Sequence, residues 1–415
     1  MLKSSNTLAK NIIWQYGLQV LKYVFPLILV PYLTRVLGTG GYAVYAYVLS
    51  FMGIVQTLAD FGFMLSGTKQ VVDLRDNCEV LSRLLGSIEL ARLLLAAGLC
   101  AVVVVVAQFI PLLWDNMGYV LIAYVSTVLR ALLPDFMFQG FEDMEPLTTR
   151  FFAAKVITVG LTLLVVHGPQ DLLLVAVADA LGGLVALIWS FMTVRTRYGV
   201  RVSFGGFRNA LAELKRSAVY CVSNIGTTLV SGFTTFVVGI VLTDPTEIAY
   251  WSLALTTVSA VQALYSPISS SLYPHVVAHR DLGAVRKMAI MAAPALLVGT
   301  VAYCLLSPQV FFLLGGQGYV AGSWVMVALS PVLPLSFYSI LIGWPVLGAL
   351  GKVNELTAST VASGVINAAL LLAMALLGRS SLFAICVIRC IAEVALLGTR
   401  GFALIECLRK GKLHV

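Results

Sequence analysis

The stretch RTRYGVRVSFGGFRNALAELKR, residues 195–216, is the most hydrophilic part of the chain, and the predicted fold is organised around it. It carries six basic side chains against a single acid, Glu213. Long apolar segments lie before and after it. Because basic loops stay in the cytoplasm, we predict that this stretch is a cytoplasmic linker between two membrane-embedded halves.

Composition places the chain among membrane proteins. Hydrophobic residues make up 60% of it and charged residues only 11%, with a mean hydropathy of +0.95, whereas soluble proteins carry about 25% charged residues. A helix needs about 20 apolar residues to cross a bilayer, and the sequence predicts six crossings in each half. They are 11–36, 41–67, 84–108, 117–140, 151–167, 171–194, 217–243, 248–278, 287–314, 322–348, 355–377 and 381–408.

The distribution of basic residues predicts the orientation. The predicted domains are an N-terminal lobe of residues 1–194, the linker 195–216 and a C-terminal lobe of residues 217–415. Basic residues gather in the N-terminal tail, in alternate loops and in the C-terminal tail with Arg409, Lys410 and Lys412, and only Arg35 and Arg379 fall on the other side. Both termini are therefore predicted to be cytoplasmic. The net charge of +8 is explained by this asymmetry, so no nucleic-acid partner is expected.

The two halves carry a weak internal repeat. Residues 42–58 and 248–264 share five identities in seventeen positions at an offset of 206. Since six crossings is an even number, both halves enter the membrane in the same sense and are related by an axis along the membrane normal. The predicted fold is an all-α integral membrane protein with twelve transmembrane helices in two six-helix lobes, related by a parallel pseudo-two-fold repeat.

Four short motifs resemble a known family. They are Thr34-Arg35-Val36-Leu37-Gly38, Tyr42-Ala43-Val44-Tyr45, Asp60-Phe61-Gly62 and Phe138-Gln139-Gly140-Phe141-Glu142-Asp143-Met144. The chain thereby resembles the polysaccharide-export branch of the multidrug/oligosaccharidyl-lipid/polysaccharide superfamily, and most of all its O-antigen flippases.

This resemblance implies a function. It implies a MATE-like fold and the transfer of undecaprenyl-pyrophosphate-linked oligosaccharide repeat units across the bacterial inner membrane by alternating access. The expected energy source is a proton or sodium gradient, and no cofactor is expected. The implied partners are the lipid-linked oligosaccharide, the bilayer, a polysaccharide polymerase and a chain-length regulator.

Charged residues inside the predicted crossings are the candidates for substrate binding, because a charge at mid-bilayer costs about 2.5 to 3.5 kcal/mol and usually faces a cavity or a partner. Arg130 is the first candidate ligand for a pyrophosphate, since a guanidinium fork fits phosphate oxygens. The alternative is an ion pair with another helix. Arg92 is a second candidate, although Glu89 three residues earlier can neutralise it.

Three lysine and arginine residues complete the predicted substrate set. Lys22 lies halfway along the first crossing, and Lys155 lies near the start of the fifth, from where it can also reach the cytoplasmic surface. Arg35 ends the first crossing and serves either the substrate or helix anchoring. In the second half, Arg389 and Glu393 are four residues apart and are predicted to form a self-contained pair.

Ion coupling requires a group that gains and loses a proton or sodium ion. Asp179 and Asp60 are the acids best placed for it, and Glu89 is a third candidate. The alternative is that these acids pair permanently with Lys22, Arg92 or Arg130.

Known enzyme motifs are absent from the sequence, and the four histidines form no metal-binding pattern, so a transporter is predicted and neither a catalytic residue nor a metal site is expected. Two rival functions stay open. An organic-cation antiporter of the same superfamily would need an acidic cavity, and a membrane-embedded enzyme of polysaccharide assembly would need a large periplasmic loop.

Overall fold

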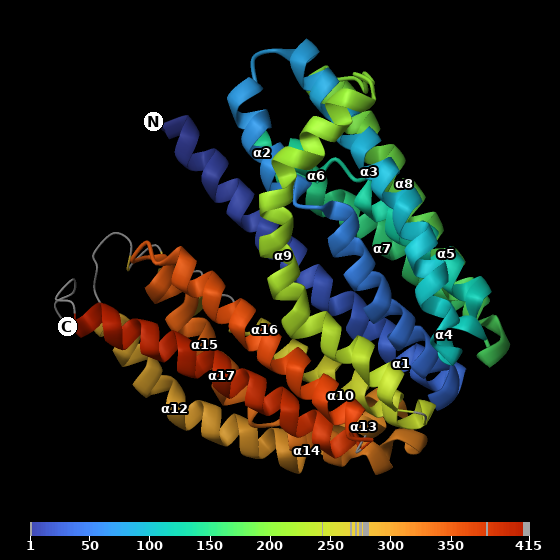
Figure 1. Cartoon of the computed structure of the whole chain (residues 1–415), viewed down its shortest axis with the longest axis vertical. Helices are drawn as coiled ribbons and strands as arrows, with labels where there is room; N and C mark the ends of the chain where they lie inside the picture. The colour runs from blue at the N-terminus through green and yellow to red at the C-terminus, as the bar shows by residue number, and fades with distance from the viewer. Residues whose placement is uncertain are drawn as a thin grey trace. The chain divides into compact units, whose positions relative to one another are not determined.

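The computed structural model describes residues 2–242, 244–265, 268–269, 272–273, 276, 282–378 and 381–409, without the side chains of 2–12, 219, 222–233 and 408–409. Every regular element in these ranges is a helix (Figure 1). The elements are α1 (Leu2–Asp60), α2 (Phe63–Leu74), α3 (Cys78–Gln108), α4 (Pro111–Trp114), α5 (Met117–Ala131), α6 (Asp135–Gly140), α7 (Glu145–Val165), η1 (Pro169–Asp171), α8 (Leu172–Tyr198), α9 (Phe207–Val241), α10 (Pro245–Ala263), α12 (Leu282–Leu305), α13 (Ser307–Gly315), η2 (Gln317–Gly322), α14 (Ser323–Leu329), α15 (Val332–Ile342), the π-helical turn η3 (Gly343–Gly348), α16 (Val353–Leu376) and α17 (Leu382–Arg409).

The chain is an all-α, multi-pass membrane protein. Among the described residues, eight helical segments are long and apolar enough to cross a bilayer, or nine if the bent pair Gln317–Leu329 and Val332–Gly348 counts as one. One of the eight, Ile13–Leu74, has 62 residues, about three times the length that a crossing needs. The backbone leaves the helical conformation at Gly38, with φ 65° and ψ −174°, and α1 ends at Asp60 before α2 begins, so this segment contains three helices. The number of twelve crossings stays a prediction.

The described chain forms two compact units, Met1–Ile225 and Gly226–Val415. The predicted linker 195–216 contains the last residues of α8 and the first ten residues of α9, and only residues 199–206 lie between the two helices. The eighth predicted crossing continues beyond residue 265 into a range that is only partly described, and Arg379, Lys410 and Lys412 lie outside the described residues. The predicted domain boundaries and the repeat stay predictions.

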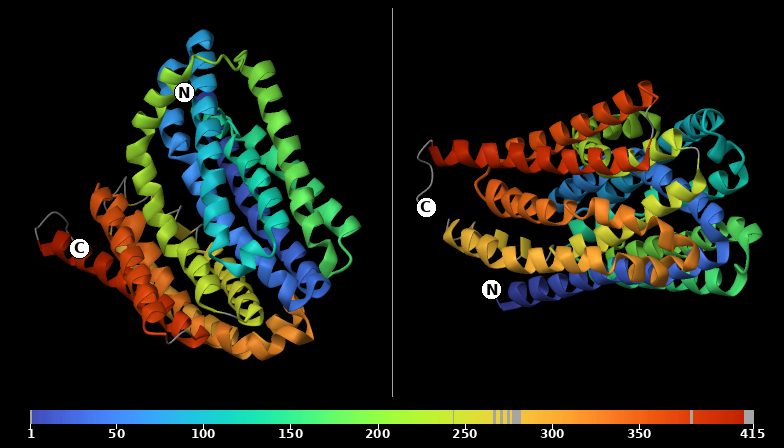
Figure 2. Two further views of the ribbon diagram at one scale, coloured as in Figure 1. Left: turned by 45° about the vertical axis from the view of Figure 1, so that its right-hand side comes forward. Right: turned by 90° about the horizontal axis from the view of Figure 1, so that it is seen from below.

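In the first unit, α8 packs along both α5 and α7, and the two further views in Figure 2 show these helices running side by side. Its core lies between α2, α3 and α6, where Phe63, Leu85, Ile88 and Phe136 are fully buried. In the second unit, α17 packs on α15 and α16.

The fourth and fifth predicted crossings differ from the structure in ways that move candidate residues. A break over residues 132–134, which includes Pro134, separates α5 from α6. Arg130 therefore lies in the last turn of α5. Helix α7 begins at Glu145, with Pro146 in its first turn, six residues before the predicted start at 151. Lys155 is therefore halfway along its helix, and the prediction that it lies near the start was wrong.

The motif Asp60-Phe61-Gly62 is a sharp break between α1 and α2. Phe61 and Gly62 have φ angles of 47° and 80°. A Cβ atom on Gly62 would lie 2.6 Å from the Cβ of Tyr220 and 2.8 Å from the backbone nitrogen of Cys221 in α9. Both the backbone conformation and the close approach of α9 therefore require glycine here.

We expect Gly62→Ala to destabilise the protein by at least about 2 kcal/mol, because a left-handed conformation and a steric clash add up. Gly98→Ala in α3 is the matched control, since a Cβ there would meet nothing within 4 Å. The midpoint of thermal unfolding in detergent is the measurement. Equal midpoints for the two variants would contradict this account of the break.

Candidate substrate and ion site

Two cationic side chains from two helices of the first unit contact Asp179, which lies on a third helix, α8. Arg130 of α5 donates its Nη1 hydrogen bond to Asp179 Oδ2, and the Nζ atom of Lys155 of α7 lies 3.3 Å from Asp179 Oδ1. Ser126, one turn before Arg130, also donates to Asp179. We name Arg130, Lys155 and Asp179 the Asp179 cluster. With all three groups ionised, it carries a formal excess of one positive charge.

The Asp179 cluster is half-buried. The side chains of Arg130, Lys155 and Asp179 are 31%, 30% and 24% exposed. The second Nη atom of Arg130 donates to Thr127 Oγ1 at 3.2 Å, so part of the guanidinium faces its own helix. A half-buried cationic excess at membrane depth is an arrangement that an anionic ligand can complete.

Close packing of α8 against α7 places Asp179 within reach of Lys155. A Cβ atom on Gly182, one turn after Asp179, would lie 2.2 Å from Thr158 Oγ1 and 2.8 Å from the carbonyl oxygen of Ala154. Small residues let membrane helices approach in this way. Glycine at this position therefore lets the carboxylate of α8 approach the Lys155 cation of α7.

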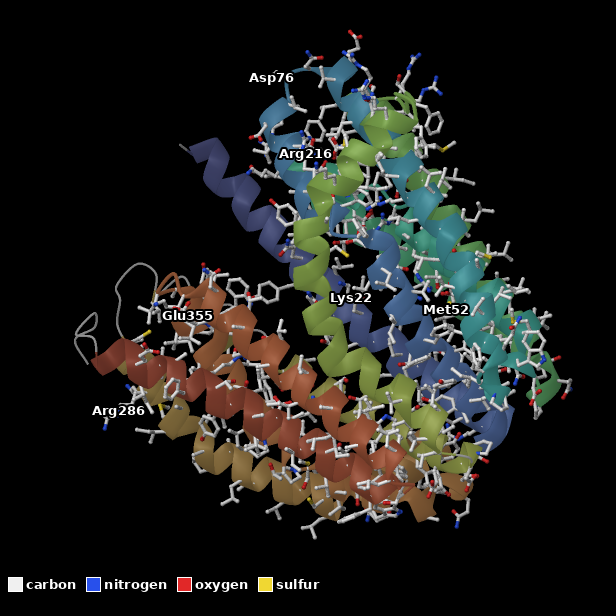
Figure 3. All side chains as sticks on the ribbon, in the orientation of Figure 1. Lys22, Met52, Asp76, Arg216, Arg286 and Glu355 are labelled. Atoms are coloured by element: carbon white, nitrogen blue, oxygen red, sulfur yellow. The ribbon has the colours of Figure 1, made fainter. Side chains whose placement is uncertain are left out.

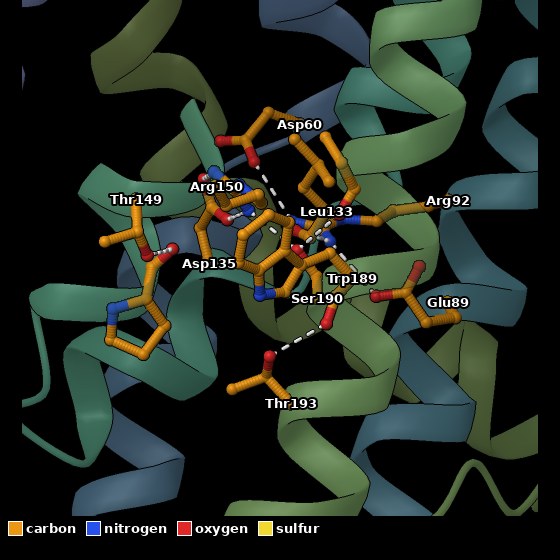
Figure 4. Close-up of polar contacts among 12 residues, drawn as sticks. Asp60, Glu89, Arg92, Leu133, Asp135, Thr149, Arg150, Trp189, Ser190 and Thr193 are labelled. Atoms are coloured by element: carbon orange, nitrogen blue, oxygen red, sulfur yellow. Dashed lines mark hydrogen bonds and ion pairs between the residues drawn. The ribbon is translucent and has the colours of Figure 1, made fainter. Parts of the chain in front are cut away.

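Arg92 is the centre of a second cluster, which Figure 4 shows. Its guanidinium lies 3.2 Å from Glu89 Oε1 and 3.3 Å from Asp60 Oδ1, and it donates to the carbonyl oxygen of Leu133 at 3.0 Å. This carbonyl belongs to the break between α5 and α6, so Arg92 joins α3 to two helix breaks at once. The predicted neutralisation of Arg92 by Glu89 is confirmed.

The Arg92 cluster is closed to a ligand in this structure. The side chains of Arg92 and Glu89 are 2% and 5% exposed. The guanidinium carbon lies 5.7 Å from the ring centre of Phe63 and 5.4 Å from that of Phe136, within the range of cation–π attraction. In this structure the partners of Arg92 all belong to the protein, and its contact with the substrate stays a prediction.

A third pair, which the sequence did not predict, joins α6 to α7. The Nη2 atom of Arg150 lies 3.1 Å from Asp135 Oδ2, its Nη1 contacts Asp135 Oδ1, and Nη1 also donates to Ser190 of α8 at 3.0 Å (Figure 4). Arg150 is 4% exposed. Asp135 and Arg150 are fifteen residues apart and on different helices, so no helical spacing signals this pair.

Sequence comparison identifies the family. Residues 8–278, more than half of the chain, match the family described as polysaccharide biosynthesis protein. The chain belongs to this family. It is 22% identical over 377 residues to a candidate O-antigen transporter of Escherichia coli (strain K12), covering 87% of this chain and 88% of that relative. A candidate O-antigen transporter of Shigella dysenteriae is 24% identical over 268 residues, covering 64% and 67%.

Solved structures show the same fold. A lipid II flippase, MurJ, in an inward closed conformation matches with a TM-score of 0.74 and 14% identity, covering 95% of this chain and 87% of that chain. An inward-facing multidrug resistance transporter of the MATE family matches with a TM-score of 0.73 and 14% identity, covering 93% and 96%. These likenesses confirm the MATE-like fold that the resemblance implied, and membership of the wider superfamily stays a prediction.

The motif of residues 138–144 holds helix ends together in this member of the polysaccharide biosynthesis family. Arg75, after α2, pairs with Glu142 at 2.7 Å. The hydroxyl of Tyr198, at the end of α8, donates to Asp143 Oδ2 at 2.7 Å, and its ring stacks on Phe141 with 4.2 Å between centroids. The motif therefore fastens α2 and α8 to the turn between α6 and α7.

Two of the predicted substrate residues of this family member lie apart from both clusters. Lys22, labelled on α1 in Figure 3, is exposed, and among the described residues it has no carboxylate within ion-pair distance. Arg35 is exposed and donates to the carbonyl oxygen of Pro31, one turn earlier, at 3.1 Å. The structure places Lys155 at the candidate site with Arg130, and does not place Lys22 or Arg35 there.

In the second unit, Arg389 and Glu393 form the predicted pair at 2.8 Å. Arg400, by contrast, donates to the carbonyl oxygen of Ser339 at 2.7 Å and to Thr360 Oγ1 at 3.1 Å, so it joins α17 to α15 and α16. Within the described ranges, no group of three His, Cys, Asp or Glu side chains is arranged to hold a metal ion; His275, His279 and His414 lie outside them.

Proposed function

We propose that this chain moves lipid-linked oligosaccharides from the cytoplasmic to the periplasmic leaflet of the bacterial inner membrane, with an undecaprenyl pyrophosphate as the carrier lipid. The observation that carries the proposal is the cationic excess of the Asp179 cluster, with half-exposed Arg130 and Lys155 inside the membrane. A pyrophosphate supplies the negative charge that the cluster lacks. The family and the relatives of Escherichia coli and Shigella dysenteriae support a polysaccharide substrate.

The Asp179 cluster also suggests how ion coupling works. While Asp179 is charged, it holds Arg130 and Lys155 through both of its carboxylate oxygens. A proton or sodium ion on Asp179 would neutralise the carboxylate and loosen its hold on the two cations, so the charge state of Asp179 and the binding of the pyrophosphate are linked through one residue.

The transport cycle proposed here is alternating access. Twelve helices in two lobes of six rock around a central site, with both termini cytoplasmic, and the prenyl chain stays in lipid while the sugar passes between the lobes. An ion gradient supplies the energy, and no cofactor takes part. A polymerase and a chain-length regulator would receive the translocated units.

An organic-cation antiporter is the second candidate, because the MATE likeness and the two acids around Arg92 favour it. The side chains of Arg92 and Glu89 in that cluster, however, are buried, with Glu89 only 5% exposed, whereas the half-buried Asp179 cluster is cationic. A cationic drug would meet repulsion at Arg130 and Lys155. The charge distribution therefore favours the anionic substrate.

Depletion of the protein in its native host tests the proposal. We expect completed lipid-linked oligosaccharides to accumulate in the cytoplasmic leaflet and long surface polymer to disappear, as measured by the accessibility of the sugar to a membrane-impermeant lectin or enzyme. Expression from a plasmid is the control and should restore both. If the units still reach the periplasm and polymer persists, the protein moves a different substrate.

A further inference from the structure

A groove of about 550 Å³ opens in the first unit between α9, α3 and the break between α1 and α2. Its apolar lining consists of Phe61, Leu95, Leu211, Ala212, Leu214 and Ala218. The α9 lining residues lie within 208–218, a span of eleven residues or about 15 Å of helix. The lining also includes Phe61, in the helix break next to Asp60.

Two cations complete the lining of this groove, which we name the α9 groove. Arg208 and Lys215 both line it, and they lie on one face of α9 because they are seven residues apart. Both are exposed, and within the described part of the chain neither has a carboxylate within ion-pair distance. Arg216, labelled in Figure 3, differs from them because it pairs with Glu213 at 3.1 Å.

The first turns of α9 have the composition of a helix at a membrane surface. Phe207 and Leu211 are 63% and 55% exposed, whereas Ala210 and Ser217 are fully buried. The buried side is fixed to α2, where Ser217 bonds Ser66 at 2.6 Å. Exposed apolar side chains beside exposed cations are typical of helices that lie at the boundary between headgroups and acyl chains.

The chemistry of the α9 groove selects its occupant. An apolar channel with two unpaired cations matches a hydrocarbon chain that ends in a negatively charged phosphate group. The described lining residues carry no hydroxyl, carboxamide or carboxylate group with which to bind a sugar. A phospholipid fits these properties, whereas an oligosaccharide-bearing lipid would leave its glycan without partners.

We propose that the α9 groove is a binding site for an anionic phospholipid, with the headgroup phosphate at Arg208 and Lys215 and an acyl chain along the groove toward Phe61. The site is separate from the Asp179 cluster, and the proposal does not depend on the transported substrate. A chain that reaches Phe61 contacts the break between α1 and α2, so occupancy would stabilise that break.

Lipid selectivity of the purified full-length protein tests this site. The protein is reconstituted in phosphatidylcholine nanodiscs, and the association of spin-labelled phosphatidylglycerol is measured relative to spin-labelled phosphatidylcholine. We expect R208Q with K215Q to weaken the preference for phosphatidylglycerol by at least about tenfold, since each cation near the surface contributes to anionic lipid binding. The reciprocal exchange R208K with K215R should keep the preference for phosphatidylglycerol, because both positive charges are retained.

The matched control removes the same charge elsewhere. R195Q with R201Q neutralises two other exposed cations outside the groove and should leave the preference unchanged. An equal loss in this control would overturn the proposal, because the attraction would then come from general surface charge. A full preference in R208Q with K215Q would overturn it as well. The proposal would also be overturned if R208Q with K215Q still bound phosphatidylglycerol but no longer bound undecaprenyl pyrophosphate, since the groove would then serve the transported lipid.

Discussion

Arg130→Ala is expected to lower the transport of lipid-linked oligosaccharide by about 30-fold. Removing one partner of a buried charge pair costs about 2 to 5 kcal/mol, and the lower limit applies because the Arg130 side chain is 31% exposed; about 2 kcal/mol corresponds to roughly 30-fold. Arg130→Lys should lose less, since it keeps the charge and loses only the two-pronged geometry. Transport into vesicles that contain equal amounts of folded protein is the measurement.

A double variant separates a ligand role of Arg130 from a structural one. If Arg130 only neutralises Asp179, then Arg130→Ala with Asp179→Ala should transport at the same rate as Asp179→Ala alone, because no unpaired carboxylate remains for Arg130 to neutralise. If Arg130 binds the pyrophosphate, the double variant should be clearly slower than Asp179→Ala alone. Arg83→Ala is the control, since Arg83 is 55% exposed and pairs with Glu79. Normal transport by Arg130→Ala would refute the proposed substrate site.

Arg92→Met is expected to lower the free energy of unfolding by about 3 to 5 kcal/mol, the usual cost of breaking a buried ion pair by removing one partner. Arg92 is 2% exposed and contacts both Glu89 and Asp60. Its loss leaves Glu89 buried and unpaired, and the carbonyl oxygen of Leu133 loses its donor. The effect is measured as the midpoint of thermal unfolding in detergent, with size-exclusion chromatography to detect the protein that stays folded.

Rescue of Arg92→Met distinguishes stability from substrate binding. Adding Glu89→Met replaces the buried pair with apolar side chains and should restore much of the stability. Arg83→Met, at the exposed end of α3, should behave like the wild type. If Arg92→Met unfolds at the wild-type temperature and yet fails in transport, Arg92 contacts the substrate, as the sequence suggested.

The local features of this chain could be predicted from its sequence. The hydropathy of the sequence predicted a membrane protein, and its short motifs predicted the family. The pairs Arg92 with Glu89 and Arg389 with Glu393 were predictable because residues three and four apart on a helix lie on one face. Ser126 could also have been found in this way, since it lies one turn before Arg130. In each case, the contact depends only on the geometry of one helix.

The candidate site required the tertiary structure. Arg130 and Asp179 are 49 residues apart in the chain, and Asp135 and Arg150 belong to different helices. Such contacts depend on the register between packed helices, which close approaches such as that of Gly182 to Thr158 determine. Exposure likewise follows from packing. The sequence by itself determined which charges enter the membrane, whereas helix packing decided that Arg130 and Lys155 face a shared carboxylate and that Arg92 is buried.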